Sequence, residues 1–164
     1  MILDEAEMTR WGRAIGEAAR PPLFLLLRGP LGAGKSVLAR SIAQGAGVEG
    51  AVPSPTFNLM LRYPTSRGGT VVHVDLYRLT DPSELWELGW QELGDDDEIV
   101  LVEWPDRAEG FLPEHRWEIT LSTVAGHRGR ARHGARRGRR QGGPTAPHGR
   151  GASGDAHRVR ESLR

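Results

Sequence analysis

The sequence predicts an α/β fold with three layers and a mostly parallel central sheet. Three observations support this class. Residues 23–27 form a continuous apolar run, which is typical of a strand buried on both faces of a parallel sheet. A glycine-rich turn and then a segment of helical composition follow that run. A second apolar run, residues 99–102, ends in the carboxylate of Glu103 and predicts a neighbouring strand.

One helix is predicted before the strand at residues 23–27 and another after it in the sequence. Residues 4–20 place apolar side chains at helical spacing and end at Pro21, which predicts an amphipathic helix that faces the sheet. These apolar positions are Met8, Trp11, Ile15 and Ala18. Residues 36–44 have helical composition and stop near Gly45. A third helix is predicted to begin at residues 81–84, where a proline and two acids form a strong N-terminal signal.

The remaining elements are predicted to be strands. Residues 57–63 and 70–76 have strand composition, and the turn residues 66–69 between them predict a hairpin. Residues 98–103 and 117–121 are predicted to complete the sheet.

Composition restricts the class of protein further. The chain has 164 residues, 38% of them hydrophobic and 26% charged, which suits one domain with one core. It has no cysteine, so disulfides, thiolate metal sites and cysteine nucleophiles are excluded. Neither the apolar run at residues 23–27 nor the charged N-terminus matches a membrane span or a signal peptide. A cytoplasmic location without membrane contact is therefore expected.

The charge is divided unevenly at residue 125. Residues 1–125 carry 11 basic and 19 acidic side chains, whereas residues 126–164 carry 11 arginines and two acids. The second segment also contains nine glycines and few apolar residues. Because it has little to bury, burial would not offset the entropy lost on ordering it. We predict a folded domain over residues 1–125 and a disordered, Arg/Gly-rich tail over residues 126–164, a composition that out-of-frame reading of GC-rich DNA would also produce.

The first motif with chemistry is GPLGAGKS, residues 29–36, between the predicted strand and helix. It matches the P-loop pattern GxxxxGK(S/T) in the context that this pattern requires. Glycines let backbone amides surround a phosphate, the lysine contacts the β- and γ-phosphates of ATP, and the serine hydroxyl binds Mg²⁺. The residues expected to bind the nucleotide are Gly29, Gly32, Ala33, Gly34, Lys35, Ser36 and Val37.

Lys35 strengthens this interpretation. It is the only lysine among 22 basic residues, so a chain that otherwise uses arginine keeps a compact ammonium where phosphate contact is needed. The alternative is a glycine-rich turn that contains lysine and serine by chance, which does not account for the flanking strand and helix. The sequence therefore predicts a P-loop NTPase-like fold that binds nucleotide phosphates.

Glu103 is the candidate for a second Mg²⁺ ligand, because it closes an apolar strand. The alternative is a solvated strand end without a ligand role. Trp104 follows directly, at the carboxyl edge of the sheet where open α/β folds bind their ligands. A packing role for Trp104 is equally consistent with its position.

Two further segments carry polar groups toward the same edge. Side chains alternate along a strand, so His73, Asp75 and Tyr77 share one face. Asp75 would either share the metal or orient a water, or else form an ion pair with Arg78. The Ser-Pro-Thr segment places the hydroxyl of Thr56 in a rigid turn, which suits a switch element at Mg²⁺ or the γ-phosphate and equally a plain turn.

These motifs together resemble one family. GPLGAGKS (29–36), SPTF (54–57), HVDLYRL (73–79) and LVEWP (101–105) occur in the order and approximate spacing of the TsaE family, also called YjeE, the bacterial ATPases of tRNA threonylcarbamoyladenosine synthesis. The phosphate loop is shared with many unrelated NTPases, whereas HxDxYR and EWP together are specific to this family. The similarity runs from about residue 4 to residue 121.

The resemblance implies a small P-loop ATPase that binds ATP and Mg²⁺, hydrolyses ATP weakly alone and associates with the TsaB and TsaD proteins. TsaD there transfers the threonylcarbamoyl group to a tRNA adenosine next to the anticodon, so tRNA contact would be indirect, through the complex. By motif, Lys35 would hold phosphate, and Ser36, Glu103 and Asp75 would serve Mg²⁺. Thr56 and Asp75 would line the nucleotide site, and Trp104 would be required for function.

Two departures from the family pattern stand out. Pro30 occupies a position where members usually have an acid, and it removes one backbone amide, which nucleotide binding is expected to survive. The family continues after the strand at residues 117–121 with a Gly-Arg segment and a further apolar strand. This chain is instead rich in arginine and glycine there, so the terminal strand is expected to be missing, and Arg128 and Arg130 are both candidates for the Gly-Arg arginine.

Two other functions stay open beside the ATPase. A P-loop small-molecule kinase would need an acceptor site and an arginine-rich lid, yet only Arg78, Arg107 and Arg116 occur between residues 76 and 117. A nucleotide-dependent RNA-binding module would depend on the tail, whose arginines attract phosphate but have no aromatic residues between them for base stacking.

Overall fold

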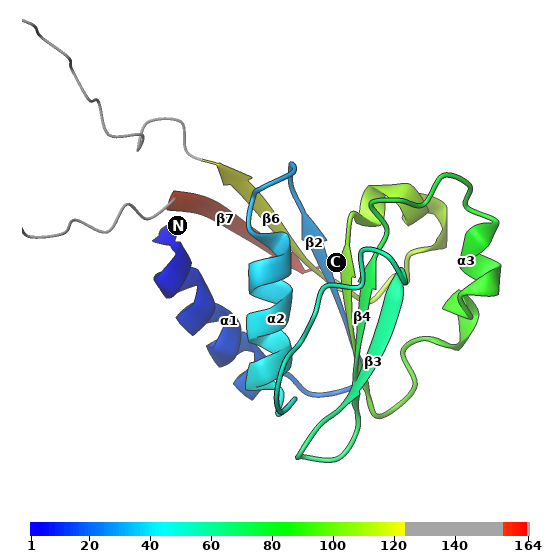
Figure 1. Cartoon of the computed structure of the whole chain (residues 1–164), viewed down its shortest axis with the longest axis horizontal. Coiled ribbons are helices and arrows are strands. Elements are labelled where there is room, and N and C mark those ends of the chain that lie inside the picture. Colours follow the sequence, from blue (N-terminus) through cyan, green and yellow to red (C-terminus); the bar gives the residue numbers. More distant parts are fainter. Residues whose placement is uncertain (124–155, 164) are drawn as a thin grey trace, which may run out of the picture.

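The computed structural model describes residues 1–123 and 156–163 of the chain (Figure 1). In this part, seven strands form one sheet in the order β1-β7-β6-β2-β5-β4-β3. The four central strands β6, β2, β5 and β4 are parallel, and the other three pair antiparallel. The strands are β1 (Ile2–Asp4), β2 (Leu23–Arg28), β3 (Met60–Pro64), β4 (Thr70–Asp75), β5 (Glu98–Glu103), β6 (Trp117–Thr123) and β7 (Ala156–Leu163). The predicted α/β fold with a mostly parallel centre is confirmed.

Helices cover both faces of the sheet and complete the three layers. They are α1 (Glu5–Ala18), α2 (Lys35–Gly45), α3 (Glu84–Glu87) and the 3₁₀ helices η1 (Trp90–Glu92) and η2 (Pro105–Phe111). α1 and α2 lie side by side on one face, and α3 lies on the other side (Figure 1). Along β2, Leu25 and Leu27 join the apolar cluster under α1 and α2, whereas Leu26 joins the opposite cluster. This two-sided burial is why the strand has no polar residue before Arg28.

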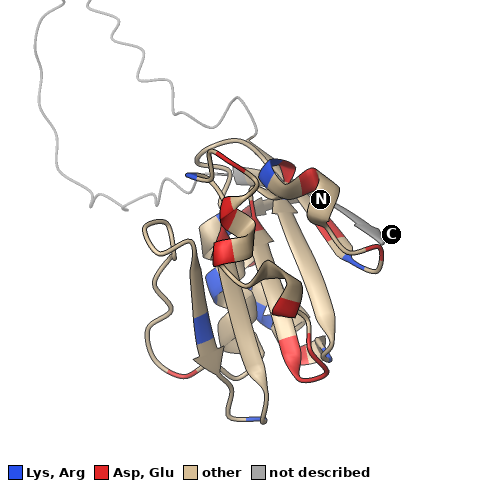
Figure 2. Cartoon of the chain, turned by 90° about the vertical axis from the view of Figure 1, so that its right-hand side faces the viewer, with Lys and Arg blue, Asp and Glu red and all other residues tan. Residues whose placement is uncertain are grey.

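The side of the molecule that carries α3 is acidic. Residues 81–118 contain 13 acidic and two basic side chains, and Figure 2 shows acidic residues along the elements of this side. Glu98, Glu103 and Glu118 of this range are buried, and the remaining acids give this side a negative surface, which repels polyanions such as nucleic acid.

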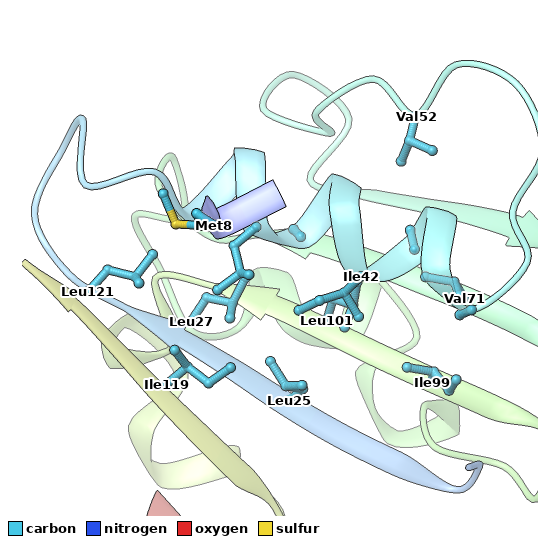
Figure 3. Packing of buried hydrophobic residues seen from close by; sticks show 14 of the residues in the cluster. Met8, Leu25, Leu27, Ile42, Val52, Val71, Ile99, Leu101, Ile119 and Leu121 are labelled. Carbon is cyan, nitrogen blue, oxygen red and sulfur yellow. The ribbon is translucent and has the colours of Figure 1, made fainter. Parts of the chain in front are cut away.

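α1 begins where the sequence predicts. The Asp4 carboxylate accepts a hydrogen bond from the Glu7 amide, and the Glu7 carboxylate accepts one from the Asp4 amide, which together form a capping box. Met8, one turn into the helix, is completely buried and reaches the layer that Leu27 and Ile42 share (Figure 3). Burial of such a side chain stabilises the fold by roughly 1.5–3 kcal/mol.

Glycines let α1 and α2 approach closely. A Cβ at Gly16 would lie 2.0 Å from the carbonyl oxygen of Ile42, and a Cβ at Gly45 would lie 2.1 Å from that of Arg13. Neither position therefore admits a side chain without a shift of the helices. These contacts lie near the C-terminal end of α2, the helix that follows the phosphate loop.

Two predicted elements differ in extent. The strand expected from residue 57 begins at Met60, because residues 56–58 form a turn in which Phe57 is 81% exposed. The helix expected from residues 81–84 is confirmed but has only four residues. Gly89 adopts a left-handed conformation directly after it and starts η1, so the chain turns instead of continuing the helix.

The expectation that residues 126–164 lack structure is wrong for residues 156–163, which form β7. This strand pairs antiparallel with both β1 and β6, and the side chain of Val159 is only 3% exposed. The family's terminal strand, expected to be missing, therefore has a counterpart here. Low hydrophobicity misled the prediction, since pairing with two neighbours satisfies the backbone and the side chain of Val159 reaches the core. Residues 124–155, which include Arg128 and Arg130, lie outside the described residues.

Removing β7 should therefore destabilise the protein. Deletion from Gly126 leaves β1 and β6 without their shared partner and removes the buried side chain of Val159. Loss of that burial alone costs roughly 1.5–3 kcal/mol, or about 3–12 °C in melting temperature. Thermal melts of the truncated chain and of a full-length Val159→Asp variant test this. Unchanged melting temperatures in both variants would mean that β7 contributes nothing.

No helix in the described ranges is long and apolar enough to span a lipid bilayer.

Candidate functional site

The phosphate loop lies where the motif predicts, between the end of β2 and the start of α2. Gly29, Gly32 and Gly34 have φ values of 140°, 77° and 89°, conformations that other residues rarely adopt. Gly34 is the N-cap of α2, and no side chain caps this end of the helix. The amides of the first turn are therefore available to an anion, and the helix dipole favours one there.

Lys35 is held inside this loop. Its side chain is only 4% exposed, and Nζ donates hydrogen bonds to the carbonyl oxygens of Gly29 at 2.8 Å and Pro30 at 2.9 Å. Burial lowers the pKa of the ammonium below its ordinary value, and the nearby charges of Glu103 and Asp75 act in the opposite direction. Pro30, the departure from the family pattern, thus contributes a carbonyl acceptor to the loop.

Ser36 and Glu103, two of the three predicted metal ligands, are brought together. The Ser36 hydroxyl donates to Oε2 of Glu103 over 2.8 Å. Glu103 is the last residue of β5, in register with Leu27 of β2 just before the loop, and only 1% of it is exposed. The solvated strand end considered as an alternative is therefore wrong for Glu103.

Asp75, the third predicted metal ligand, lies beside Glu103 in the register of β4 and β5 but makes its own contacts. Its Oδ2 accepts a hydrogen bond from the Thr56 hydroxyl at 2.9 Å, and its Oδ1 accepts one from the Tyr77 amide at 3.1 Å. The alternative partner Arg78 instead lies 4.4 Å from the centre of the Phe57 ring. The structure thus joins Thr56 to Asp75 and Ser36 to Glu103, as two adjacent pairs.

Trp104 covers the lysine. The residue follows β5 in a left-handed conformation with φ 57°, and its ring centre lies 3.7 Å from Nζ of Lys35. The ring of Tyr77 packs against the ring of Trp104, with their centroids 5.0 Å apart. A cation–π contact of this kind holds the ammonium without a counter-charge. Trp104 therefore belongs to the site and not only to the core.

Three residues at the site were not assigned by sequence reasoning. His73 Nε2 lies 2.9 Å from Oε1 of Glu103. The sequence placed His73 on the same strand face as Asp75 but gave it no role. Glu5 and His157 line the phosphate pocket from α1 and β7. His157 gave no signal, since the surrounding composition predicted a tail.

A pocket of about 290 Å³ opens over these groups. Its lining combines the loop, the end of β5 and the two distant segments: Glu5, Leu31, Gly32, Gly34, Lys35, Ser36, Val37, Glu103, Trp104 and His157. A larger hollow of about 510 Å³ lies at the opposite edge of the sheet, beside Arg20 and Arg67. Both of those guanidinium groups donate to backbone carbonyls, so the larger hollow offers less chemistry than the smaller one.

Within residues 1–123 and 156–163, no three His, Cys, Asp or Glu side chains cluster as ligands of a metal ion. The carboxylate of Glu103 and the hydroxyl of Ser36 are the oxygens that meet beside the phosphate loop. This donor set suits Mg²⁺, which commonly takes one or two protein carboxylates and completes its shell with substrate phosphates and water.

Comparison with known proteins agrees with the fold and the motifs. The TsaE model, described as threonylcarbamoyl adenosine biosynthesis protein TsaE, matches residues 2–132. Among relatives, the tRNA threonylcarbamoyladenosine biosynthesis protein TsaE of Haemophilus influenzae is 40% identical over 118 residues, 69% of this chain and 74% of that protein. The protein of the same name from Treponema pallidum is 31% identical over 119 residues, 73% of this chain and 87% of that protein.

A crystal structure extends the comparison to three dimensions. YdiB of Bacillus subtilis superposes with a TM-score of 0.62 at 26% identity, covering 77% of this chain and 78% of that one. The fold, the family match and the sequence relatives point the same way. The chain therefore belongs to the TsaE family, whose members are proteins of tRNA threonylcarbamoyladenosine biosynthesis.

Proposed function

We propose that this protein is a Mg²⁺-dependent ATPase that acts with TsaB and TsaD in the threonylcarbamoylation of tRNA adenosine. The observation that carries the proposal is the contact between Ser36 of the phosphate loop and Glu103 at the end of β5, 2.8 Å apart and next to Lys35. Family membership supports the pathway, and this geometry supports the chemistry.

The loop residues bind the phosphates of the substrate ATP. The backbone amides of the first turn of α2, which no side chain caps, follow the positive-φ glycines of the loop and would bind the phosphate oxygens. Lys35 already bonds two oxygen acceptors, so phosphate oxygens replace the carbonyls of Gly29 and Pro30 with partners of the same geometry and greater charge.

Ser36 and Glu103 provide the oxygen ligands for Mg²⁺. When bound, the ion neutralises charge on the phosphate oxygens and lowers the barrier to their displacement. Asp75 lies on the neighbouring strand and is fixed by the Thr56 hydroxyl, which suits it to orient the attacking water or to share the metal through the outer shell. Trp104 keeps the ammonium of Lys35 at the loop.

Weak hydrolysis by the isolated protein follows from what the pocket contains. Among the described residues that line it, none is an arginine. P-loop enzymes that hydrolyse quickly use such a cation to stabilise charge in the transition state, with an effect of roughly 10³–10⁵ on turnover. We propose that such a cation reaches the pocket from a partner protein or from a part of the chain outside residues 1–123 and 156–163.

The acidic charge on the α3 side of the molecule favours indirect contact with tRNA. Residues 81–118 contain 13 acidic and two basic side chains, and although Glu98, Glu103 and Glu118 are buried, acidic residues prevail on the α3 side (Figure 2). Nucleic acid binding relies on positive charge, which this side does not offer. We propose that the α3 side does not contact tRNA and that the TsaB–TsaD complex engages it, as the family resemblance implies.

A reconstituted reaction tests the proposal. Phosphate release from ATP is measured with this protein alone, with TsaB and TsaD, and with the complex plus tRNA. We expect slow hydrolysis alone, at least a roughly 10-fold increase with the complex, and modified adenosine only when this protein and ATP are both present. Retention on immobilised TsaD should also depend on ATP. Transfer of phosphate to a small molecule would favour the kinase alternative, and no nucleotide binding at all would refute the proposal.

A further inference from the structure

His73 is a polar residue in an apolar layer. It lies on β4 between the buried residues Val71 and Asp75 of the same face, and only 1% of it is exposed. Its Nδ1 atom is buried and has no hydrogen-bond partner among the described residues. Packing alone would favour an apolar side chain here, because a buried nitrogen without a partner costs free energy. The hydrogen bond of its other ring nitrogen, Nε2, is therefore the reason for a polar side chain at this position.

That bond ends on the acid of the candidate metal site. Nε2 of His73 lies 2.9 Å from Oε1 of Glu103, and both side chains are almost completely buried. A carboxylate only accepts hydrogen bonds, so Nε2 carries the proton and donates. The other oxygen, Oε2, accepts from Ser36. The Glu103 carboxylate is thus held at two points, by one strand neighbour and by the phosphate loop.

A second orientation would be available to Glu103 without this hold. Lys35 and Glu103 line the same pocket, and the negative charge of Glu103 acts to raise the pKa of Lys35. In the structure Lys35 nevertheless bonds the carbonyls of Gly29 and Pro30 and not a carboxylate. A Glu103 side chain freed at Oε1 would turn toward the ammonium and leave Ser36.

We infer that His73 is a positioning residue, which fixes the Glu103 carboxylate toward Ser36 and away from Lys35. The inference rests on the proposed function, because it concerns the acid expected to serve Mg²⁺. Groups that orient a metal ligand in this way typically change metal affinity or activity by roughly 10- to 100-fold when they are removed.

Three variants separate positioning from packing. His73→Leu removes the donor and keeps an apolar side chain of similar bulk, whereas His73→Gln keeps an N–H near the position of Nε2. Val71→Ala is the matched control, since it creates a cavity two residues away on the same strand face without touching Glu103. Thermal melts show how much each variant loses in stability.

The first measurement is the affinity for ADP by calorimetry, in EDTA and at increasing MgCl₂. We expect His73→Leu to raise the half-saturating Mg²⁺ concentration roughly 10- to 100-fold, with affinity in EDTA within about twofold of wild type. His73→Gln and Val71→Ala should both lie within about threefold of wild type. If wild type itself does not bind ADP, the proposed function fails; if wild type shows the Mg²⁺ effect and His73→Leu keeps it, only the inference on His73 fails.

A second measurement needs neither metal nor nucleotide. Lys35 is the only lysine, so protein labelled with ¹³Cε-lysine gives one NMR signal from the site. The Trp104 ring 3.7 Å from Nζ makes this signal sensitive to small movements. In EDTA, His73→Leu should shift the signal as Glu103 turns toward Lys35, whereas Val71→Ala should not. An unmoved signal in His73→Leu overturns the inference.

If His73→Leu does not fold, His73→Asn takes its place. Its amide is one bond shorter than that of glutamine and reaches the position of Nδ1, not that of Nε2, so only His73→Gln restores the bond to Glu103. Equal Mg²⁺ responses of the Gln and Asn variants would overturn the inference as well.

Discussion

Replacing Lys35 with alanine is expected to lower ATP turnover by roughly 100- to 1000-fold, the usual effect of removing a group that stabilises transition-state charge. Nucleotide affinity should fall too, because the phosphates lose their only ammonium contact among the residues that line the pocket. The loop keeps its glycines and amides, so weak residual binding is expected. Binding is weakened but not abolished because the glycines and amides shape the loop, whereas Lys35 supplies the positive charge.

Phosphate release and ADP calorimetry measure the two effects of Lys35→Ala. Arg40→Ala is the matched control, since it removes one positive charge from the same helix, where Arg40 bonds the carbonyl of Val52 and not the loop. Melting curves for both variants check that each is folded. Turnover and affinity equal to wild type in Lys35→Ala would eliminate the phosphate-loop site.

Replacing Glu103 with glutamine is expected to separate binding from hydrolysis. The change keeps the length of the side chain and removes its charge, so Mg²⁺-dependent turnover should fall by roughly 100-fold or more. Nucleotide affinity in EDTA should stay within about threefold, because the loop amides and Lys35 remain. The measured quantities are turnover at saturating ATP and ADP affinity with and without MgCl₂.

Glu98→Gln supplies the control for Glu103→Gln. It is the same substitution at the other end of β5, where Glu98 is also buried but contacts Arg62 and the Gly94 amide. A loss of stability with normal Mg²⁺ dependence is expected there. If Glu103→Gln lost affinity in EDTA as severely as turnover, Glu103 would be a structural residue and not a metal ligand.

Local signals were sufficient to predict the centre of this fold. The apolar runs of β2 and β5 have no polar residue because both faces of these strands are covered, and that pattern is visible without any structure. The helical spacing of residues 4–20 and the hairpin before Thr70 are equally local. Errors arose where distant contacts decide the outcome. The strand after Phe57 starts late because an exposed turn precedes it, and β7 forms because β1 and β6 lie on either side of it.

The site shows the same division between local and distant information. Lys35 and Ser36 sit in one continuous motif, and Glu103 ends an apolar strand, the pattern that predicted its place at the carboxyl edge of the sheet; β5 pairs with β2. His73 reaches Glu103 only because β4 pairs with β5 in one particular register. A single sequence does not specify that register, so His73 had no assignable role before the structure placed it.

The two hydrogen bonds of Lys35 to Gly29 and Pro30 also bear on how nucleotide exchanges. The ammonium has acceptors of its own within the loop, so an incoming phosphate competes with them, and the observed affinity is the difference between two sets of contacts. When the product leaves, the Lys35 ammonium is not left without a partner, since it donates to the carbonyls of Gly29 and Pro30 again. This exchange of Lys35 between loop carbonyls and phosphate lowers the affinity for nucleotide but also lowers the barrier to its release. A loop built this way would suit brief occupancy by the nucleotide that we propose it binds.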